Sequence, residues 1–143
     1  MGKIRLGSDD IKHMTLFETL TGARVKDCVQ VENAMGFLVD KGEMGLAIGK
    51  NGANIEKVRH ALGREVFVVE FAESPADFIK NMFSPVKIRQ VRIHESKDDK
   101  VADIDVKRAD RKRVIGQEGI RIKMAKEMSK RHYDIANINI KVI

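Results

Sequence analysis

One short pattern occurs twice in this chain, 67 positions apart, and its repetition is the strongest constraint on the fold. The first copy runs from Ile48 to Ile55 as Ile-Gly-Lys-Asn-Gly-Ala-Asn-Ile. The second runs from Ile115 to Ile122 as Ile-Gly-Gln-Glu-Gly-Ile-Arg-Ile. A single Gly-x-x-Gly arises often by chance, but a duplicate in matching surroundings predicts two related structural units.

The two glycines of each copy predict a tight turn that leads into a helix. Glycine lacks a Cβ atom, so it adopts the backbone angles of such a turn and lets another backbone approach closely. A helix that begins at the second glycine directs unpaired N–H groups and a partial positive charge towards the turn. This arrangement attracts phosphate oxygens. A turn between helices without any ligand is the alternative interpretation of each copy.

Composition favours a globular protein of a reducing compartment. The chain has 143 residues, of which 43% are apolar, enough for one ordinary domain or two compact ones. The single cysteine, Cys28, excludes an intrachain disulfide and any zinc site made of several cysteines. No apolar run approaches the ~18 residues that a membrane helix needs. We therefore expect a cytoplasmic protein without a membrane partner.

Positive charge is concentrated in the second half of the chain. Residues 1–72 hold 10 basic and 10 acidic side chains, whereas residues 73–143 hold 17 and 11. The second half therefore accounts for the whole net charge of +6. A basic surface of this kind favours a polyanionic partner.

The first half predicts the order helix–strand–strand–helix–turn–helix–strand. Apolar residues recur at helical spacing from Ile11 to Leu20, with Ser8 as a candidate N-cap and Gly22 as the stop. The expected strands cover residues 28–31, 37–39 and 66–71, and a turn containing Asn33 and Gly36 joins the first two.

The second half predicts the same order. Ser74 is a candidate N-cap, and Pro75 suits the first position of the helix that follows. Apolar alternation over residues 86–93 slips once near Gln90, which predicts a strand with a bulge. A solvated turn over residues 96–100, a return strand over 102–106 and a closing strand over 138–143 complete this half.

The closing strand of each half follows a helical segment, so it is expected to lie parallel to its neighbour. Each half should then form a small three-stranded mixed sheet covered by helices, which is an α+β sandwich. We place the first domain at residues 1–72 and the second at residues 73–143.

The glycine turns and the element order resemble a known family. Ile-Gly-Lys-Asn-Gly and Ile-Gly-Gln-Glu-Gly are similar to the Gly-x-x-Gly loops of KH domains, and the order of elements resembles their type II variant. Two type II domains in so short a chain resemble the archaeal homologues of the NusA transcription termination and antitermination factor. The resemblance covers nearly the whole chain.

This resemblance implies that the protein binds single-stranded RNA, with each KH loop clamping the backbone of about four nucleotides. RNA polymerase and other transcription factors are further candidate partners. We expect no cofactor and no metal, because no residues show a local metal-ligand spacing. The composition agrees, because no Trp, one Tyr and six Phe leave little for the aromatic platforms of other RNA binders.

Carried over by motif, the resemblance assigns two groups of RNA-binding residues. The distribution of basic residues adds a third, for which a solvated charged face is the alternative. The loops contact the RNA backbone, four isoleucines line an aliphatic groove beside them, and nearby basic side chains hold phosphates. The loop residues are Gly49, Lys50, Asn51, Gly52, Gly116, Gln117, Glu118 and Gly119; the isoleucines are Ile48, Ile55, Ile115 and Ile122; the basic residues are Arg59, Arg113, Arg121 and Lys123. A place in the core is the alternative role of the isoleucines, above all of Ile55 and Ile122.

Two features depart from the family pattern. Glu118 places a carboxylate in the second loop, where it repels phosphate unless neighbouring cations such as Arg111 and Lys112 compensate. The first loop is therefore expected to be the better phosphate clamp. The chain also has no room for the polymerase-binding N-terminal region or the S1 domain of bacterial NusA. Any action on RNA polymerase is expected to need these residues or a separate partner.

Other classes of function have weaker support in the sequence. Neither glycine turn is the P-loop of a nucleotide-binding protein, and the four histidines lie at least 34 positions apart, so we do not expect an enzyme. A protein-interaction adaptor with degenerate KH loops is a second alternative, which Glu118 favours and Lys50 opposes. A ribosome-associated RNA scaffold is a third, although the long basic tails typical of such proteins are missing.

Overall fold

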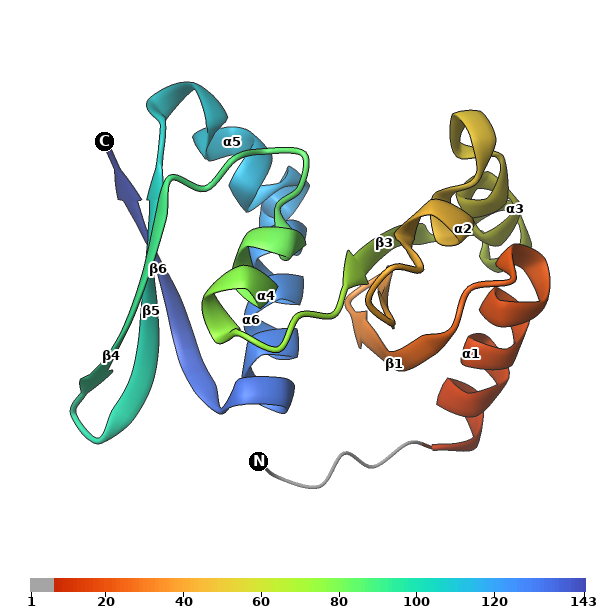
Figure 1. The fold of residues 1–143 in the computed structure, drawn as a ribbon, viewed down its shortest axis with the longest axis horizontal. Helices are drawn as coiled ribbons and strands as arrows, with labels where there is room; N and C mark the ends of the chain where they lie inside the picture. The colour runs from red at the N-terminus through yellow and green to blue at the C-terminus, as the bar shows by residue number, and fades with distance from the viewer. Residues whose placement is uncertain (1–6) are drawn as a thin grey trace. The chain divides into compact units, whose positions relative to one another are not determined.

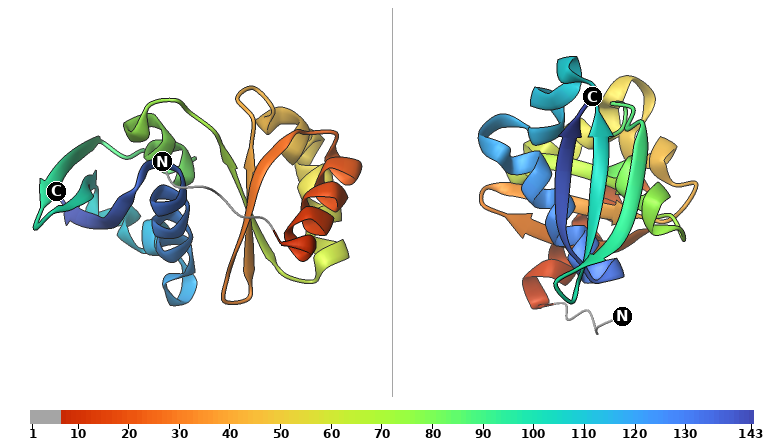
Figure 2. Two further views of the ribbon diagram at one scale, coloured as in Figure 1. Left: turned by 90° about the horizontal axis from the view of Figure 1, so that it is seen from below. Right: turned by 90° about the vertical axis from the view of Figure 1, so that its left-hand side faces the viewer.

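A computed structural model describes residues 7–143, which divide into two compact units. Residues 7–71 form the first unit and residues 72–143 form the second unit. Each unit is a three-stranded sheet with helices packed against it (Figures 1 and 2). In both sheets the central strand pairs antiparallel with the first strand and parallel with the third. The predicted α+β class and the parallel closing strands are confirmed.

The first unit begins with a helix whose start differs by one residue from the prediction. Gly7 is the N-cap, and its N–H group donates to the Asp10 carboxylate at 3.1 Å, so Ser8 is the first helical residue instead of the cap. Gly22 ends the helix with φ +79°, as predicted. The elements are α1 (Ser8–Thr21), β1 (Val25–Val31), β2 (Ala34–Val39), α2 (Met44–Ile48), the one-turn η1 (Lys50–Gly52), α3 (Ala53–Leu62) and β3 (Glu65–Glu70).

The core of the first unit forms between α1 and β2. The rings of Phe17 and Phe37 stack with centroids 4.4 Å apart, and both side chains are fully buried. Gly36 lies inside β2 opposite Val29 and not in the preceding turn, so that part of the prediction is wrong. Ile11 is 54% exposed although its spacing matches the apolar face.

The second unit begins with a helix that is capped as predicted. The Ser74 hydroxyl accepts the N–H of Asp77 at 3.3 Å, and Pro75 is the first helical residue. Phe78 packs edge-on against Tyr133 with ring centroids 5.2 Å apart. The elements are α4 (Pro75–Met82), β4 (Gln90–Ser96), β5 (Asp99–Val106), the one-turn η2 (Arg108–Asp110), α5 (Arg111–Ile115), the one-turn η3 (Gln117–Gly119), α6 (Ile120–Tyr133) and β6 (Ile135–Val142).

The antiparallel hairpin of the second unit starts later in the chain than predicted, and its turn is shorter. Strand β4 starts at Gln90, and the buried side chains of Val86 and Ile88 belong to an irregular segment before it, so the slip in alternation marks a strand start and not a bulge. Only Lys97 and Asp98 form the turn, with φ of +50° and +69°. Positive φ at both central positions is the geometry of a type I′ turn, which suits the twist of paired strands.

Candidate nucleic-acid interface

The two Gly-x-x-Gly loops have the same backbone conformation. Gly49 and Gly116 have φ/ψ of +76°/171° and +79°/169°. The third loop residues, Asn51 and Glu118, are left-handed at +55°/27° and +56°/22°. In each loop the N–H of the last glycine donates to the carbonyl of the first at 3.1 Å. The loops are therefore two copies of one turn, although their central residues differ.

The first glycine of each loop is required by both its torsion angles and its surroundings. The combination of φ near +77° and extended ψ is open essentially to glycine alone. A Cβ atom on Gly49 would lie 2.8 Å from the backbone nitrogen of Asn54, and one on Gly116 would lie 2.9 Å from that of Arg121. The helix after the loop thus approaches the first glycine too closely for any side chain.

The side chain two positions after the loop holds the preceding helix in place. Asn54 donates from Nδ2 to the carbonyl of Leu46 at 2.7 Å. At the equivalent place Arg121 donates to the carbonyl of Arg113 at 3.3 Å, and it also donates to the carbonyl of Ser84 at 2.8 Å. The carbonyls of Leu46 and Arg113 lie in the short helices before the two glycine turns, α2 and α5. The same fastening is therefore made by an amide in one unit and by a guanidinium in the other.

Arg121 is thus engaged within the protein, although the charge pattern of the sequence predicts it as an RNA-binding residue. Its side chain is half-buried and lies over the ring of Phe83, 5.9 Å from the centroid. Burial, together with the nearby Arg113 charge, lowers the pKa of Arg121. The fastening role of Asn54 has no signal in its neighbouring residues, although the 67-residue offset pairs it with Arg121.

The central loop residues are accessible, whereas the isoleucines are covered to different degrees. Lys50, Asn51, Gln117 and Glu118 are exposed. The loop glycines are half-buried, and so are Ile48, Ile115 and Ile122. Ile55 is only 7% exposed and belongs to the core of the first unit. The core alternative therefore describes Ile55, while its counterpart Ile122 keeps some accessible surface.

Two further basic residues of the predicted set have partners inside the protein. Arg59 donates to the Glu56 carboxylate at 2.7 Å and to the carbonyl of Val66 at 3.2 Å. Arg113 lies 3.6 Å from the Asp110 carboxylate but is otherwise exposed, and Lys123 is exposed on α6. Phosphate would have to compete with Glu56 for Arg59, because a guanidinium fixed between two acceptors is less free to turn to a ligand.

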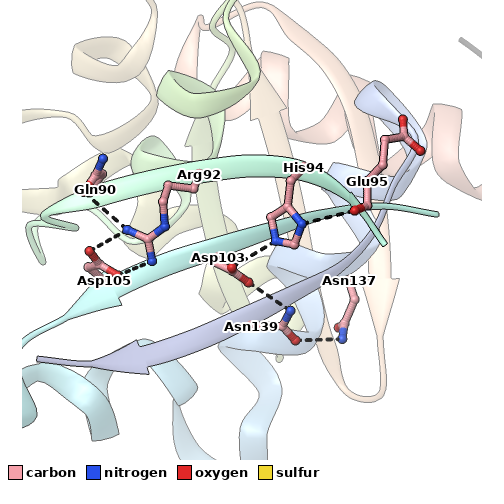
Figure 3. A network of polar contacts seen from close by, with 8 residues as sticks. All are labelled: Gln90, Arg92, His94, Glu95, Asp103, Asp105, Asn137 and Asn139. Atoms are coloured by element: carbon pink, nitrogen blue, oxygen red, sulfur yellow. Dashed lines mark hydrogen bonds and ion pairs between the residues drawn. The ribbon is translucent and has the colours of Figure 1, made fainter. Parts of the chain in front are cut away.

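The face of the second sheet opposite Ala102 and Ile104 carries a polar network across all three strands (Figure 3). Arg92 donates two hydrogen bonds, of 2.8 and 2.7 Å, to the two oxygens of the Asp105 carboxylate. Asp103 accepts from Asn139 at 3.0 Å and contacts His94 at 2.9 Å.

These contacts favour the charged forms of both carboxylates. The Asn139 hydrogen bond, helped by His94, lowers the pKa of Asp103. The Arg92 hydrogen bond lowers the pKa of Asp105. Because each acid is satisfied by a neighbour on an adjacent strand, the network belongs to the cross-strand pairing of the sheet.

Comparison with known proteins places both units in one family. A family profile described as "NusA-like second KH domain" matches residues 75–142, and one described as "KH domain" matches residues 11–73. A Halobacterium salinarum protein named "Probable transcription termination protein NusA" is 36% identical over 137 residues, which cover 96% of this chain and 98% of that one. The chain belongs to the NusA-like family with tandem KH domains.

Two further similarities support the same assignment. The Methanocaldococcus jannaschii protein of the same name is 31% identical over 140 residues, which cover 98% of this chain and 76% of that protein. The crystal structure of APE1850 is similar with a TM-score of 0.82 at 30% identity, covering 95% of this chain and all of the other. The two named relatives are named for transcription termination and not for a catalysed reaction.

The described part of the chain holds neither a helix that could span a membrane nor a cluster of metal ligands. Between residues 7 and 143, no helix is both long enough and apolar enough to cross a membrane. In the same stretch, no three side chains of the His, Cys, Asp or Glu types come together in a way that holds a metal ion.

Proposed function

We propose that this protein is a transcription termination or antitermination factor of the NusA type that holds nascent single-stranded RNA through its Gly-x-x-Gly loops. The observation that carries the proposal is the repetition of one glycine turn, with one backbone geometry, ahead of helix α3 and helix α6. The first N–H groups of a helix lack internal acceptors and favour an anion. A phosphate group of the RNA backbone is the ligand that suits both turns.

The side chains of the first loop support this function more directly than those of the second. Lys50 adds an ammonium group to the exposed turn, and Asn51 adds an uncharged amide. In the second loop Glu118 is the only charged residue, so the favourable charge there must come from outside the loop. A protein-interaction adaptor is therefore the second candidate function, and Glu118 is the observation that favours it for the second unit.

The test is a fluorescence-anisotropy titration with labelled single-stranded RNA and matched duplex RNA at two salt concentrations. We expect salt-sensitive preference for the single strand, with log K falling by about 0.7 per decade of salt for each phosphate neutralised. Equal binding to both forms, or a flat response to salt, would shift the assignment to the adaptor.

A pair of variants localises the binding to the first loop. Lys50→Asp with Asn51→Asp should weaken RNA binding by roughly tenfold or more, because it turns a cationic site into an anionic one. The matched control is Ser96→Asp with Lys97→Asp, which makes the same charge change at an exposed hairpin turn where Lys97 has φ +50°. Equal loss in both variants would mean that net charge and not the loop governs binding.

A further inference from the structure

The segments that lead into the two glycine loops carry opposite charge. In the first unit this segment is residues 40–46, where Asp40 and Glu43 outweigh Lys41. In the second unit the equivalent segment, residues 107–113, contains five basic residues and one acid. The loops themselves show the reverse, since the first holds Lys50 and the second holds Glu118. In the first unit the positive charge thus lies in the loop, whereas in the second unit it lies in the segment before the loop.

Four of these cations have no side-chain partner among the residues that the structure describes. Lys107, Arg108, Arg111 and Lys112 are all exposed, and none of them makes a side-chain hydrogen bond or an ion pair with another residue in the 7–143 range. The one acid of the segment, Asp110, is paired with Arg113 at 3.6 Å. We call these four residues the basic turn.

The basic turn presents its cations close to one another and to the glycine loop. Arg108, Arg111 and Lys112 lie in the continuous run of η2 and α5, and Lys107 is the N-cap residue directly before it. Side chains three or four positions apart are neighbours on such a helix surface. Lys107 with Arg111, and Arg108 with both Arg111 and Lys112, have this spacing. Helix α5 ends at Ile115, directly before Gly116, so at a rise of 1.5 Å per residue the basic turn lies about 6 to 14 Å from the loop along the helix.

We propose that the basic turn is a phosphate-binding surface that extends the RNA path beyond the second Gly-x-x-Gly loop. The second unit then takes its affinity from the cations before the loop, while Glu118 weakens the loop itself as a phosphate clamp. This inference rests on the proposed RNA-binding function. RNA is favoured over an acidic protein because the basic turn adjoins a loop whose geometry already suits a phosphate backbone.

The test neutralises the basic turn in the full chain. The variant Lys107→Gln, Arg108→Gln, Arg111→Gln and Lys112→Gln is titrated with a labelled 12-nucleotide single-stranded RNA across a range of salt. If each cation neutralises one phosphate, the slope of log K against log salt should become shallower by about 2.8. At low salt the affinity should fall by roughly tenfold or more.

The matched control removes the same charge elsewhere in the second unit. Lys80→Gln, Lys87→Gln, Lys97→Gln and Lys130→Gln alters four exposed lysines, so both variants lose four positive charges from a net of +6. A control that keeps a slope close to wild type supports a localised surface. Equal changes in both variants would overturn the proposal, because binding would then respond only to net charge.

Two further results distinguish failure of this proposal from failure of the proposed RNA-binding function. If wild-type protein shows no salt-sensitive preference for single-stranded RNA, the proposed function fails. If wild type binds RNA, the Lys50 and Asn51 variant loses binding and the basic-turn variant matches its control, only the present inference fails. Tighter wild-type binding to labelled polyglutamate than to RNA would assign the basic turn to an acidic protein and overturn it as well.

Discussion

The two Gly-x-x-Gly loops share one backbone but differ in almost every property that a ligand would sense. Their glycines agree in φ and ψ to within a few degrees, yet the first loop carries Lys50 and the second carries Glu118. The side chain that fastens the preceding helix is neutral Asn54 in one unit and charged Arg121 in the other. Glycine torsion angles thus fix the turn, while the residues between and around the glycines remain free to vary.

The largest expected effect concerns the first glycine of each loop. Gly49→Ala and Gly116→Ala should each lower the free energy of unfolding by about 3 kcal/mol, because the torsion angles alone cost of order 1–3 kcal/mol and the new Cβ meets backbone. Gly52→Ala and Gly119→Ala should cost about 1 kcal/mol, since the nearest atoms lie 3.9 Å from their Cβ positions.

Urea unfolding measures these differences in each unit. The chain has one tyrosine and no tryptophan, so Tyr133 fluorescence reports on the second unit, and far-ultraviolet circular dichroism reports on both. Equal costs at the first and last glycines would show that the close approach of the helix does not constrain the loop.

The next effect compares the two fastening side chains. Arg121→Met should lower stability by about 2–3 kcal/mol, because it removes hydrogen bonds from a charged donor to two carbonyls. Asn54→Ala should cost about 1 kcal/mol, since it removes one neutral hydrogen bond. Arg121→Lys serves as the control that keeps the charge. Loss of RNA affinity in Arg121→Met without loss of stability would instead assign this guanidinium to the ligand.

Exchange of the loop residues tests whether charge alone distinguishes the loops. Gln117→Lys with Glu118→Asn gives the second loop the residues of the first, and Lys50→Gln with Asn51→Glu does the reverse. We expect the first variant to bind single-stranded RNA several-fold more tightly and the second about tenfold more weakly, which corresponds to about 1.4 kcal/mol. If anisotropy titrations show no change in either variant, the loops do not supply the phosphate contacts.

The smallest expected effect is a pH dependence confined to the second unit. Contacts lower the folded-state pKa of Asp103 and Asp105 below the unfolded value near 3.8. Their contribution is therefore present above about pH 4 and is lost as the pH falls through the lower folded values. Asp103→Asn with Asp105→Asn should be less stable at pH 6 but should lose less stability on acidification.

Tyr133 fluorescence during urea unfolding between pH 2.5 and 6 measures this effect. Asp98→Asn with Asp99→Asn makes the same charge change at two exposed residues of the same hairpin. A steeper acid limb in the Asp103 and Asp105 variant than in wild type would contradict the assigned direction.

Most of the fold follows from local patterns in the sequence. The stop at Gly22, the Ser74 cap and the repeated glycine turn each depend on the torsion angles or hydrogen bonds of a few adjacent residues. The sequence predicts where strands start less accurately. Val86 and Ile88 are buried without being in a strand, so their alternation places the start of β4 too early. Burial and pairing give the same apolar alternation, so the pattern does not separate them.

The candidate site was less predictable than the fold, since a basic residue has the same sequence signature whether it is free or engaged. Arg121 reaches a carbonyl 37 positions away, and Arg59 is held by Glu56 and Val66. Lys107 and Arg108 were not among the predicted site residues. Applying the 67-residue offset beyond the glycine loops shows that Lys107 stands where the first unit has Asp40, whereas Arg108 stands where it has Lys41.

The sequence by itself determined the repeat, the order of elements and the conformation of the two loops, because glycine torsion angles and apolar periodicity act over a few residues. Only the tertiary structure decided which cations are available to a ligand. That availability depends on whether a carbonyl or carboxylate from a distant part of the chain comes within hydrogen-bonding distance. Among residues 7–143, Arg121 meets such an acceptor and Lys107 does not, and this difference arises from folding and not from composition.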